Sequence, residues 1–457
     1  MLDSYRNYSV ATLISLLLIG EVLRKYIYHS NIVLATTELL AIIVATALWV
    51  RIEKYFAIPL SVAIGALIVW KLVTIAIGHQ DPALGLIGLR SFLVPCAFLI
   101  IGLAIHRALG WQAAASIINR TFTIWFLVIG VVMVLQLIAG RDHWINALPE
   151  GFGDERAGIG DYTVGDVGIE FLFRPTSIFL HTGKAGATLA VLTIYRLYHA
   201  VSTGKTLCYI SIGVSLDVAI LLLSGQRAAL IAYTFAALCL LLFQLRKWRI
   251  WKITVVSLLI GVFIIALPVA VSRNGESSVE LTISKMMLLR AASVIEDIPY
   301  RLSDNVIEPF LYVWDQFAFS PAGVGAFSLG ASVFGGTPLY EIVPIGTAEN
   351  SWLRMLAEEG VVGLLGACVF WGCMTLWPVY ALTRGHRRVH AGGQRSIERR
   401  QIDLLCSTIV LALLLLWSNT HDILGNTLVM GLGALLFGAV AAPLKRHGVS
   451  RSVKNRL

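Results

Sequence analysis

Four polar stretches interrupt a largely apolar chain, and each carries side chains suited to acid–base chemistry or to binding an anion. The last of them, TAENSWLRMLAEEG at 347–360, places Glu349 directly before a helix-favouring run. A carboxylate in such a position can take the proton of an attacking hydroxyl group. It can equally do no more than complement the dipole at the start of a helix. The sequence leaves both interpretations open.

The residues after Glu349 follow a helical spacing. Asn350 is a good N-cap residue, because its side chain can accept hydrogen bonds from the first free backbone amides. Asn350, Arg354 and Glu358 recur every four residues and therefore share one polar face. Arg354 and Glu358 also have the i,i+4 spacing of an ion pair. We predict a helix that begins after Asn350, with these three residues as candidate substrate-binding groups.

The first polar stretch, FRPTSIFLHTGKAGA at 173–187, carries Arg174, His181 and Lys184 beside small residues. Glycine and alanine allow the backbone to approach a ligand closely, so the three cationic or titratable side chains are candidate substrate-binding groups. An ordinary entry from a loop into a helix is the alternative interpretation.

The two remaining stretches each contribute one arginine. Arg227, in LLLSGQRAAL at 221–230, lies in a tight connection between two apolar runs, where a snorkelling arginine is the alternative to a functional one. Arg301 precedes the sequence SPAGVGAF within the stretch 295–330. The glycines there predict a loop packed closely against another part of the chain. A solvated amphipathic helix with Arg301 on its polar face is the alternative.

The elements that position these residues must be membrane helices. The chain has 457 residues, of which 57% are hydrophobic and 14% charged, with a mean hydropathy of +0.78. Soluble domains carry roughly 25% charged residues. A core cannot absorb this much apolar surface, so the bilayer must solvate most of it, and soluble classes are excluded.

We therefore predict an all-α polytopic membrane protein with about twelve transmembrane helices and two large extracytoplasmic loops. Each predicted span is about long enough for the roughly 30 Å hydrocarbon core. The twelve spans are 9–23, 31–50, 56–78, 91–106, 122–140, 185–201, 207–225, 228–245, 253–272, 360–382, 404–420 and 427–444.

The distribution of lysine and arginine sets the orientation. With the amino terminus in the cytoplasm, 22 of these residues lie in the inner segments and 12 in the much longer outer segments. This bias satisfies the positive-inside rule and places both termini in the cytoplasm. The net charge of +9 thus indicates topology rather than binding to nucleic acid.

The resulting organisation has six parts. They are spans one to five at 1–140, an extracytoplasmic loop at 141–184, spans six to nine at 185–272, a large extracytoplasmic catalytic loop at 273–349, the motif helix with spans ten to twelve at 350–444, and a basic cytoplasmic tail at 445–457.

The order of the four stretches resembles the O-antigen ligase and polymerase superfamily. The resemblance rests on RPTSIF, on SGQR, on an arginine followed by a tryptophan and P-x-G-V-G, and on ENSWLRMLAEEG, and it covers about 174–363. It implies an enzyme of the bacterial inner membrane that transfers a glycan from an undecaprenyl diphosphate carrier to a hydroxyl acceptor at the periplasmic face. It further implies an inverting displacement without a metal ion or cofactor, in which Arg227 and Arg301 act on the diphosphate and Arg174 leads a binding loop.

Charge arguments agree with these implied roles. Guanidinium groups form charge-assisted, often bidentate bonds to phosphate and stabilise the charge that develops on a leaving group. The chain has no Asp-rich metal motif, and its six cysteines show neither C-x-x-C nor zinc spacing.

One departure from the ligase pattern falls on the candidate base. Asn350, Leu353, Glu358 and Gly360 keep the register of that pattern, but Glu349 stands where the ligases place a histidine, their presumed base. The difference points to the polymerase branch. The resemblance then implies a polymerase of carrier-linked repeat units of O-antigen, capsule or exopolysaccharide, with Glu349 as base and His181 as a spare candidate.

Three other functions compete with the polymerase. The nearest is an O-antigen ligase that transfers glycan to lipid A–core. A twelve-span secondary transporter would place its charges at mid-membrane near broken helices, where the sequence offers only Glu21, Lys71 and Asp217. A non-catalytic scaffold would tolerate the loss of Arg227, Arg301 and Glu349.

The partners follow from the same reasoning. We expect a carrier-linked glycan donor, a glycan or lipid-linked acceptor, and membrane lipids. The sequence leaves open whether a co-polymerase regulates chain length, and no nucleic acid is expected.

Overall fold

The computed structural model describes residues 2–28, 31–49, 54–78, 81–139, 143–146, 159–164, 167–173, 175–244, 307–327, 350–385, 394–418, 424 and 426–441. Its helices are α1 (Leu2–Leu23), α2 (Asn31–Trp49), α3 (Lys54–Ile77), α4 (Pro82–Leu109), α5 (Trp111–Ala139), α6 (Thr182–Ser202), α7 (Leu207–Leu223), α8 (Arg227–Gln244), α11 (Glu308–Phe317), α13 (Ser351–Gly385), α14 (Gln394–Trp417) and α15 (Thr427–Leu436). Short π- or 3-10 segments are η1 (Arg24–Tyr28), η2 (Trp144–Asn146) and η6 (Phe437–Ala441).

Helix length and composition are consistent with a polytopic membrane protein. Six of the described helices, α2, α3, α4, α5, α13 and α14, are long and apolar enough to cross a membrane, and α7, α8 and α15 with η6 are shorter apolar helices. Eleven of the twelve predicted spans coincide with a described helix. The ninth, 253–272, lies outside the described residues, so the number twelve stays a prediction.

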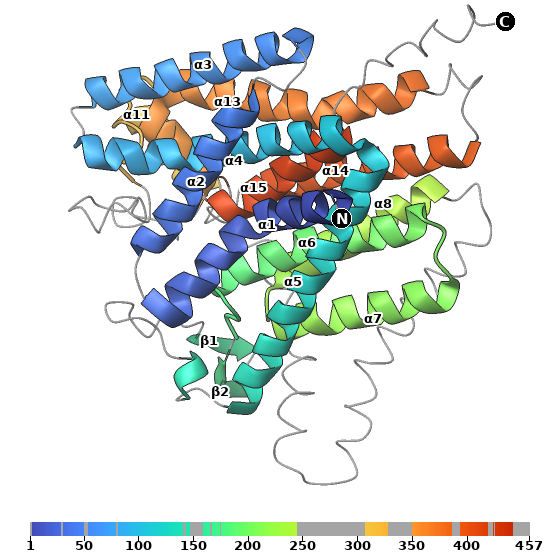
Figure 1. The fold of residues 1–457 in the computed structure, drawn as a ribbon. Helices are drawn as coiled ribbons and strands as arrows, with labels where there is room; N and C mark the ends of the chain where they lie inside the picture. The colour runs from blue at the N-terminus through green and yellow to red at the C-terminus, as the bar shows by residue number, and fades with distance from the viewer. Residues whose placement is uncertain are drawn as a thin grey trace, which may run out of the picture.

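Helix α4 runs between α3 and α15 in Figure 1, and it packs against α2, α15 and η6. In its apolar stretch 72% of residues are buried, compared with 17% in α3, whose apolar side chains therefore face outward. Two glycines bring α4 and η6 into backbone contact. A methyl group on Gly102 would lie 2.5 Å from the Leu435 carbonyl oxygen, and one on Gly438 would lie 2.4 Å from that of Leu99.

The first predicted outer loop contains two strands that the sequence analysis did not predict. β1 (Ile159–Val164) pairs antiparallel with β2 (Val167–Phe173), and Val164 lies opposite Val167. The two connecting residues are Gly-Asp, a pair typical of a tight hairpin, so a local signal was present. The helical body agrees with the predicted all-α class, and this hairpin is an addition to it.

Helix α13 is interrupted inside its length. Gly360 has φ 68° and ψ −173°, so two helical segments meet there at a kink. The positive φ is readily available only to glycine. The segment before the kink is the predicted motif helix, and the segment after it coincides with predicted span ten.

Candidate functional site

The motif helix begins as the sequence predicts. Asn350 Oδ1 accepts hydrogen bonds from the backbone amides of Trp352, at 2.9 Å, and Leu353, at 3.2 Å. The helix start is also fixed to its neighbours, because the Ser351 amide donates to the Ser418 carbonyl oxygen and Ser351 Oγ accepts from the Leu424 amide, both at 2.9 Å. The role of Asn350 as an N-cap is confirmed.

The loop PAGVG, residues 321–325, docks onto the kink in α13. The amides of Ala322 and Gly323 donate to the carbonyl oxygens of Ala357 and Glu358, at 2.9 and 3.0 Å. Val361, just after the kink, donates to Ala318 at 2.9 Å. The break at Gly360 thus exposes backbone groups that the loop satisfies, and two of the motif stretches form one unit.

The other side of this loop contacts α4 and the end of α3. Gly325 has φ 91°, and a methyl group on it would lie 1.9 Å from the Leu84 carbonyl oxygen. A methyl group on Gly78 would lie 2.1 Å from the Ala322 carbonyl oxygen. The predicted close packing of the loop glycines is therefore confirmed, and it leaves no room for side chains.

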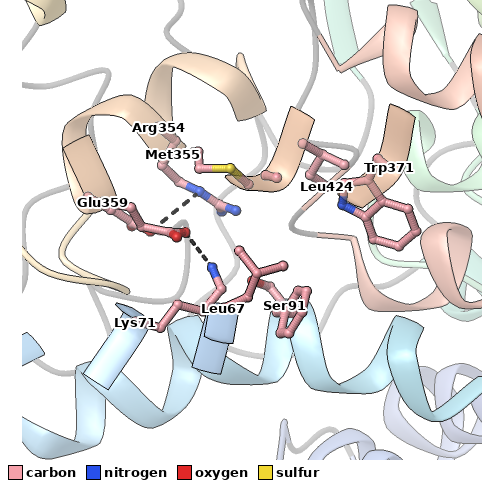
Figure 2. A pocket seen from close by; sticks show the side chains of 11 residues that line it. Leu67, Lys71, Ser91, Arg354, Met355, Glu359, Trp371 and Leu424 are labelled. Atoms are coloured by element: carbon pink, nitrogen blue, oxygen red, sulfur yellow. Dashed lines mark hydrogen bonds and ion pairs between the residues drawn. The ribbon is translucent and has the colours of Figure 1, made fainter. Parts of the chain in front are cut away.

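Four charged side chains gather beside this loop, and we call the region that they line the kink pocket. They are Lys71, Arg354, Glu358 and Glu359. Figure 2 shows Lys71 of α3 directed at the Glu359 carboxylate, with which it forms a buried ion pair. The Arg354 Nε to Glu358 Oε2 distance is 3.9 Å, which confirms the predicted i,i+4 pair. Trp70 Nε1 also donates to the Glu359 carbonyl oxygen, at 3.1 Å.

Glu358 has a second, structural contact. Its Oε1 accepts a hydrogen bond from the Phe327 amide at 3.0 Å, so the carboxylate closes the end of the PAGVG loop. The side chain is 4% exposed. In this structure Glu358 therefore binds its own chain, and it can influence a substrate by holding the loop.

The kink pocket encloses a cavity of about 20 Å³, also lined by Ser91, Phe92, Trp371 and Leu424. A single water needs roughly 10–15 Å³. The cavity thus has room for about one water, and a sugar requires the surrounding elements to move apart.

A second group of buried charges lies where α1, α2, α4 and α6 meet, and we call it the cation-rich cluster. Glu21 Oε1 accepts from Lys184 Nζ at 2.5 Å, and Glu21 Oε2 lies 3.3 Å from a nitrogen of Arg24. Glu38 Oε2 lies 3.2 Å from Arg90 Nε. Glu38 is close enough to Glu21 and Lys184 for their charges to interact, which joins the two sets of ion pairs.

Among the described residues, cationic side chains outnumber carboxylates in this cluster. With Lys25, which is 1% exposed and interacts with Glu21, four cationic side chains surround the two carboxylates Glu21 and Glu38. Burying net charge is costly unless a counter-ion or a proton change compensates it. The arrangement therefore suits an anionic ligand, and the 36% exposed Arg90 side chain gives it an opening.

Lys25 belongs to both the cation-rich cluster and a clamp on the RPTS motif. Its Nζ donates to Thr176 Oγ1 at 2.7 Å and to the Ser177 carbonyl oxygen at 2.5 Å. Burial lowers the pKa of the Lys25 ammonium, which follows the first predicted span, to about 7, against the opposing effect of the Glu21 carboxylate.

Ser177 is held in an unusual backbone conformation by this clamp. It is fully buried with φ 53°, and its carbonyl oxygen also accepts from Tyr26 Oη at 2.9 Å and Gln136 Nε2 at 3.2 Å. Gln136 Oε1 accepts from the Ser177 amide at 2.7 Å. Non-glycine residues in this region persist only where surrounding contacts enforce the conformation. The clamp thus fixes the loop that leads into α6, including Lys184.

The SGQR motif forms the turn between α7 and α8. Three residues, 224–226, connect the helices, and Gly225 has φ 66°, which confirms the predicted tight connection. A methyl group on Gly186 would lie 2.5 Å from Gln226 Cβ, so this turn packs against the first turns of α6. Two further motif stretches, separate in sequence, are therefore neighbours in the fold.

The structure thus describes only part of the predicted site. Arg174, Arg301 and Glu349 lie outside the described residues, and Arg227 is described by its backbone position at the start of α8. His181 precedes α6 and lies close enough to Glu21 for their charges to interact. Lys184 belongs to the cation-rich cluster, whereas Asn350, Arg354 and Glu358 belong to the motif helix.

Sequence reasoning missed several residues of these two regions. Glu38 and Glu359 are acidic residues within apolar helices, and such residues are functional candidates by default, so their own positions carried a signal. Arg24, Lys25 and Arg90 were counted for topology alone. Glu21 and Lys71, considered for a transporter, form ion pairs, as does Asp217, whose Oδ1 lies 2.6 Å from Arg196 Nη1.

Comparison with known proteins gives no further assignment. No protein-family model matches the chain, and no curated protein matches it either. Within the described part of the chain, no group of three His, Cys, Asp or Glu side chains is placed to hold a metal ion.

Proposed function

We propose that this chain is a polymerase of undecaprenyl-diphosphate-linked oligosaccharide repeat units, working at the outer face of a bacterial inner membrane with both termini in the cytoplasm. Its product would be an O-antigen, capsule or exopolysaccharide chain. The single observation that carries the proposal is the convergence of the cation-rich cluster and the kink pocket, with the four motif stretches around them, at the predicted outer ends of the helices.

The two regions adjoin through shared elements. Ser91, which lines the kink pocket, follows Arg90 of the cation-rich cluster on α4. Leu424 lines the same pocket, and three residues later Thr427 Oγ1 donates to Glu38 Oε1 at 2.5 Å. The two regions are therefore neighbours, which supports the placement of an anionic group and an acceptor side by side.

The proposed chemistry assigns separate tasks within this layer. The donor diphosphate lies against cationic side chains, with Arg227, Arg301 and Arg174 supplying guanidinium groups near the leaving oxygen. The acceptor hydroxyl attacks the anomeric carbon and loses its proton to Glu349. The anomeric bond to the diphosphate breaks with inversion, and the carrier diphosphate leaves with the negative charge.

Substitution of these residues separates catalysis from scaffolding. We expect Arg227→Ala and Arg301→Ala to abolish chain extension while the protein stays in the membrane, and Glu349→Gln to be nearly inactive with Glu349→His partly active. Glycan length in cells, with immunoblots of membranes for protein level, measures this. Long glycan from both arginine variants would contradict catalysis, and full activity of Glu349→Gln would reduce Glu349 to a helix cap.

A secondary transporter is the second candidate, favoured by one specific observation. The break in α13 at Gly360 lies directly beside buried Glu358, Glu359 and Lys71, and transporters place charged residues at broken helices. Within the described residues, however, Lys71 pairs with Glu359 and Arg354 pairs with Glu358, so the charges at the break balance.

Deletion of the gene distinguishes the candidate functions through the glycans that accumulate. A polymerase predicts single repeat units on the carrier and no long chains. Long carrier-linked chains together with bare lipid A–core would instead identify an O-antigen ligase. Long chains on their normal acceptor would contradict both transferase functions and leave the transporter, which a flux assay in proteoliposomes then tests.

A further inference from the structure

Helix α11 has three faces with different surroundings. The first face packs on the motif helix. Pro309 and Val313 are buried, and Val313 forms a small core with Leu353 and Leu356 of α13. This contact fixes how the other two faces are directed.

The second face of α11 is apolar and exposed. Phe310, Leu311 and Trp314 have exposed fractions of 38%, 63% and 41%, and Ile307, just before the helix, is 53% exposed. Because an α-helix turns about 100° per residue, positions 307, 310, 311 and 314 form one stripe, directly beside the buried face. Phe319, which is 83% exposed, follows the helix. Its ring meets that of Trp314 edge to face, with 6.2 Å between the ring centroids.

The third face is polar. Glu308, Asp315 and Gln316 are exposed, and Gln316 Nε2 donates to Asp315 Oδ2 at 3.1 Å. The helix therefore presents protein-packed, apolar and polar sectors in succession. A helix in bulk water gains nothing from the apolar sector, and a membrane-spanning helix does not tolerate the acidic one.

The position of α11 explains all three sectors. Ala318, at its end, accepts a hydrogen bond from Val361 at the kink of α13, and the following loop contacts Gly78 at the end of α3. Figure 1 shows α11 beside the end of α3 and next to α13. Both helices carry exposed apolar side chains, among them Leu72 and Ile77 on α3 and Val362 on α13. The apolar stripe thus adjoins the surface that these helices present to lipid.

We propose that α11 is an interfacial helix whose stripe of Ile307, Phe310, Leu311 and Trp314 lies in the headgroup–acyl boundary of the outer lipid leaflet, with its acidic face in water. Tryptophan is enriched at this depth because its ring is apolar and its N–H is polar. An interfacial helix is amphipathic in the same sense, with one apolar and one charged face. The partner is the phospholipid of the leaflet, and the inference does not require the proposed polymerase activity.

Two cysteine variants test this arrangement on opposite faces of the same helix. Leu311→Cys and Gln316→Cys are treated with a membrane-impermeant maleimide in spheroplasts and in proteoliposomes of the purified protein. Labelling is expressed relative to the SDS-denatured variant, and the unsubstituted protein gives the background of its six cysteines. We expect Gln316→Cys to label nearly fully in spheroplasts, and Leu311→Cys to label at least tenfold less in both preparations.

Each other result overturns the proposal. Equal labelling of both variants means that water covers the stripe. Protection of Leu311→Cys in spheroplasts but not in proteoliposomes means that another protein covers it. Labelling of Gln316→Cys only in inverted vesicles would place α11 on the inner face and would also contradict the topology of the proposed function. Loss of polymerase activity alone leaves the inference about α11 intact.

A photocrosslinker distinguishes lipid from another segment of this chain. With p-benzoylphenylalanine at position 311, illumination in proteoliposomes is expected to add the mass of a phospholipid to the peptide that contains α11. A crosslink to another peptide of the chain in place of the lipid adduct overturns the proposal.

Discussion

The cation-rich cluster and the kink pocket are both buried, yet they differ in charge balance. The kink pocket sets Lys71 and Arg354 against Glu358 and Glu359, and its pairs are complete within the chain. In the part of the chain that the structure describes, the cation-rich cluster sets four cationic side chains against two carboxylates. A balanced buried set can hold helices in place without any ligand, whereas an unbalanced one gains stability from an added anion. Under the proposed function, we therefore expect the first to position helices and the second to bind the anionic group.

The largest effect is expected from breaking one buried ion pair in each region. Lys71→Leu leaves Glu359 without its ion-pair partner, at a cost of about 3–5 kcal/mol in the free energy of unfolding. Lys184→Leu removes one of the two ion pairs of Glu21, which keeps Arg24, so its cost should be smaller. Replacing both Lys71 and Glu359 by leucine recovers most of this stability, because that pair then leaves no uncompensated charge. Thermal unfolding in detergent and glycan length in cells measure the outcome.

The paired variants then separate the two regions. Lys71→Leu/Glu359→Leu is expected to regain both stability and chain extension, since these charges only position α3 and α13. Glu21→Leu/Lys184→Leu is expected to regain neither, since Arg24 loses its carboxylate partner and the proposed anionic ligand loses Lys184. Identical behaviour of the two double variants would remove the distinction.

The kink at Gly360 is the next target. Gly360→Ala forces an L-residue to φ 68° and places its methyl group 2.9 Å from the Ala318 carbonyl oxygen. Such strain costs about 1–3 kcal/mol, and displacement of the PAGVG loop should lower chain extension in parallel. Gly372→Ala, later in α13, is the matched control, because its methyl group meets nothing within 4 Å. Equal melting temperatures for the two variants would show that the kink is dispensable.

A smaller effect follows from removing one cation at the opening of the cluster. Arg90→Gln keeps a long polar side chain at a position that is 36% exposed, but the buried Glu38 carboxylate loses its charged partner, so the melting temperature should fall modestly. Chain extension should fall about tenfold, which corresponds to roughly 1.4 kcal/mol of lost interaction with an anion. Arg107→Gln, exposed at the opposite end of α4, is the control. A similar loss in both variants would point to a general charge effect.

The smallest effect concerns pH. The folded-state pKa of Lys25, about 7, lies below its ordinary value near 10.5. Its proton is therefore lost as pH rises through 7 in the folded protein but only near 10.5 in the unfolded one. Burial of the charged form costs stability fully below pH 7, and this cost disappears as pH rises from about 7 to 10.5.

Chain extension should change with pH in the direction opposite to stability. The cluster loses one positive charge between about pH 6 and 8, so chain extension should fall severalfold across this range. Lys25→Met should give a lower rate with a flatter profile, and a rate assay at constant ionic strength measures both profiles. An unchanged slope in Lys25→Met would assign the pH dependence to another group.

The sequence predicts the helices well and the contacts between them poorly. Eleven predicted spans coincide with helices because a long apolar run has few alternatives in a bilayer. The cap at Asn350, the Arg354–Glu358 pair and the tight glycine loop were predictable because each depends on residues a few positions apart. The Ser177 clamp joins residues 41 and 151 or more positions apart, and no local pattern indicates it.

In the charged regions too, local sequence patterns do not indicate which distant residues meet. The kink at Gly360 follows from the docking of the PAGVG loop, more than thirty residues upstream, and the helix sequence itself contains no proline near it. Glu38 and Glu359 were recognisable as acids in apolar runs. Their partners Arg90 and Lys71 were not, because pairing depends on which helices meet.

The most direct test of the proposed function is chain extension by the purified protein. Repeat units on their lipid carrier, extracted from cells that lack the gene, are mixed with the protein in proteoliposomes, and glycan length is measured by gel electrophoresis and mass spectrometry. The account predicts a ladder of carrier-linked chains that is absent with Arg227→Ala. Repeat units that stay single with the correctly folded, unsubstituted protein would contradict it.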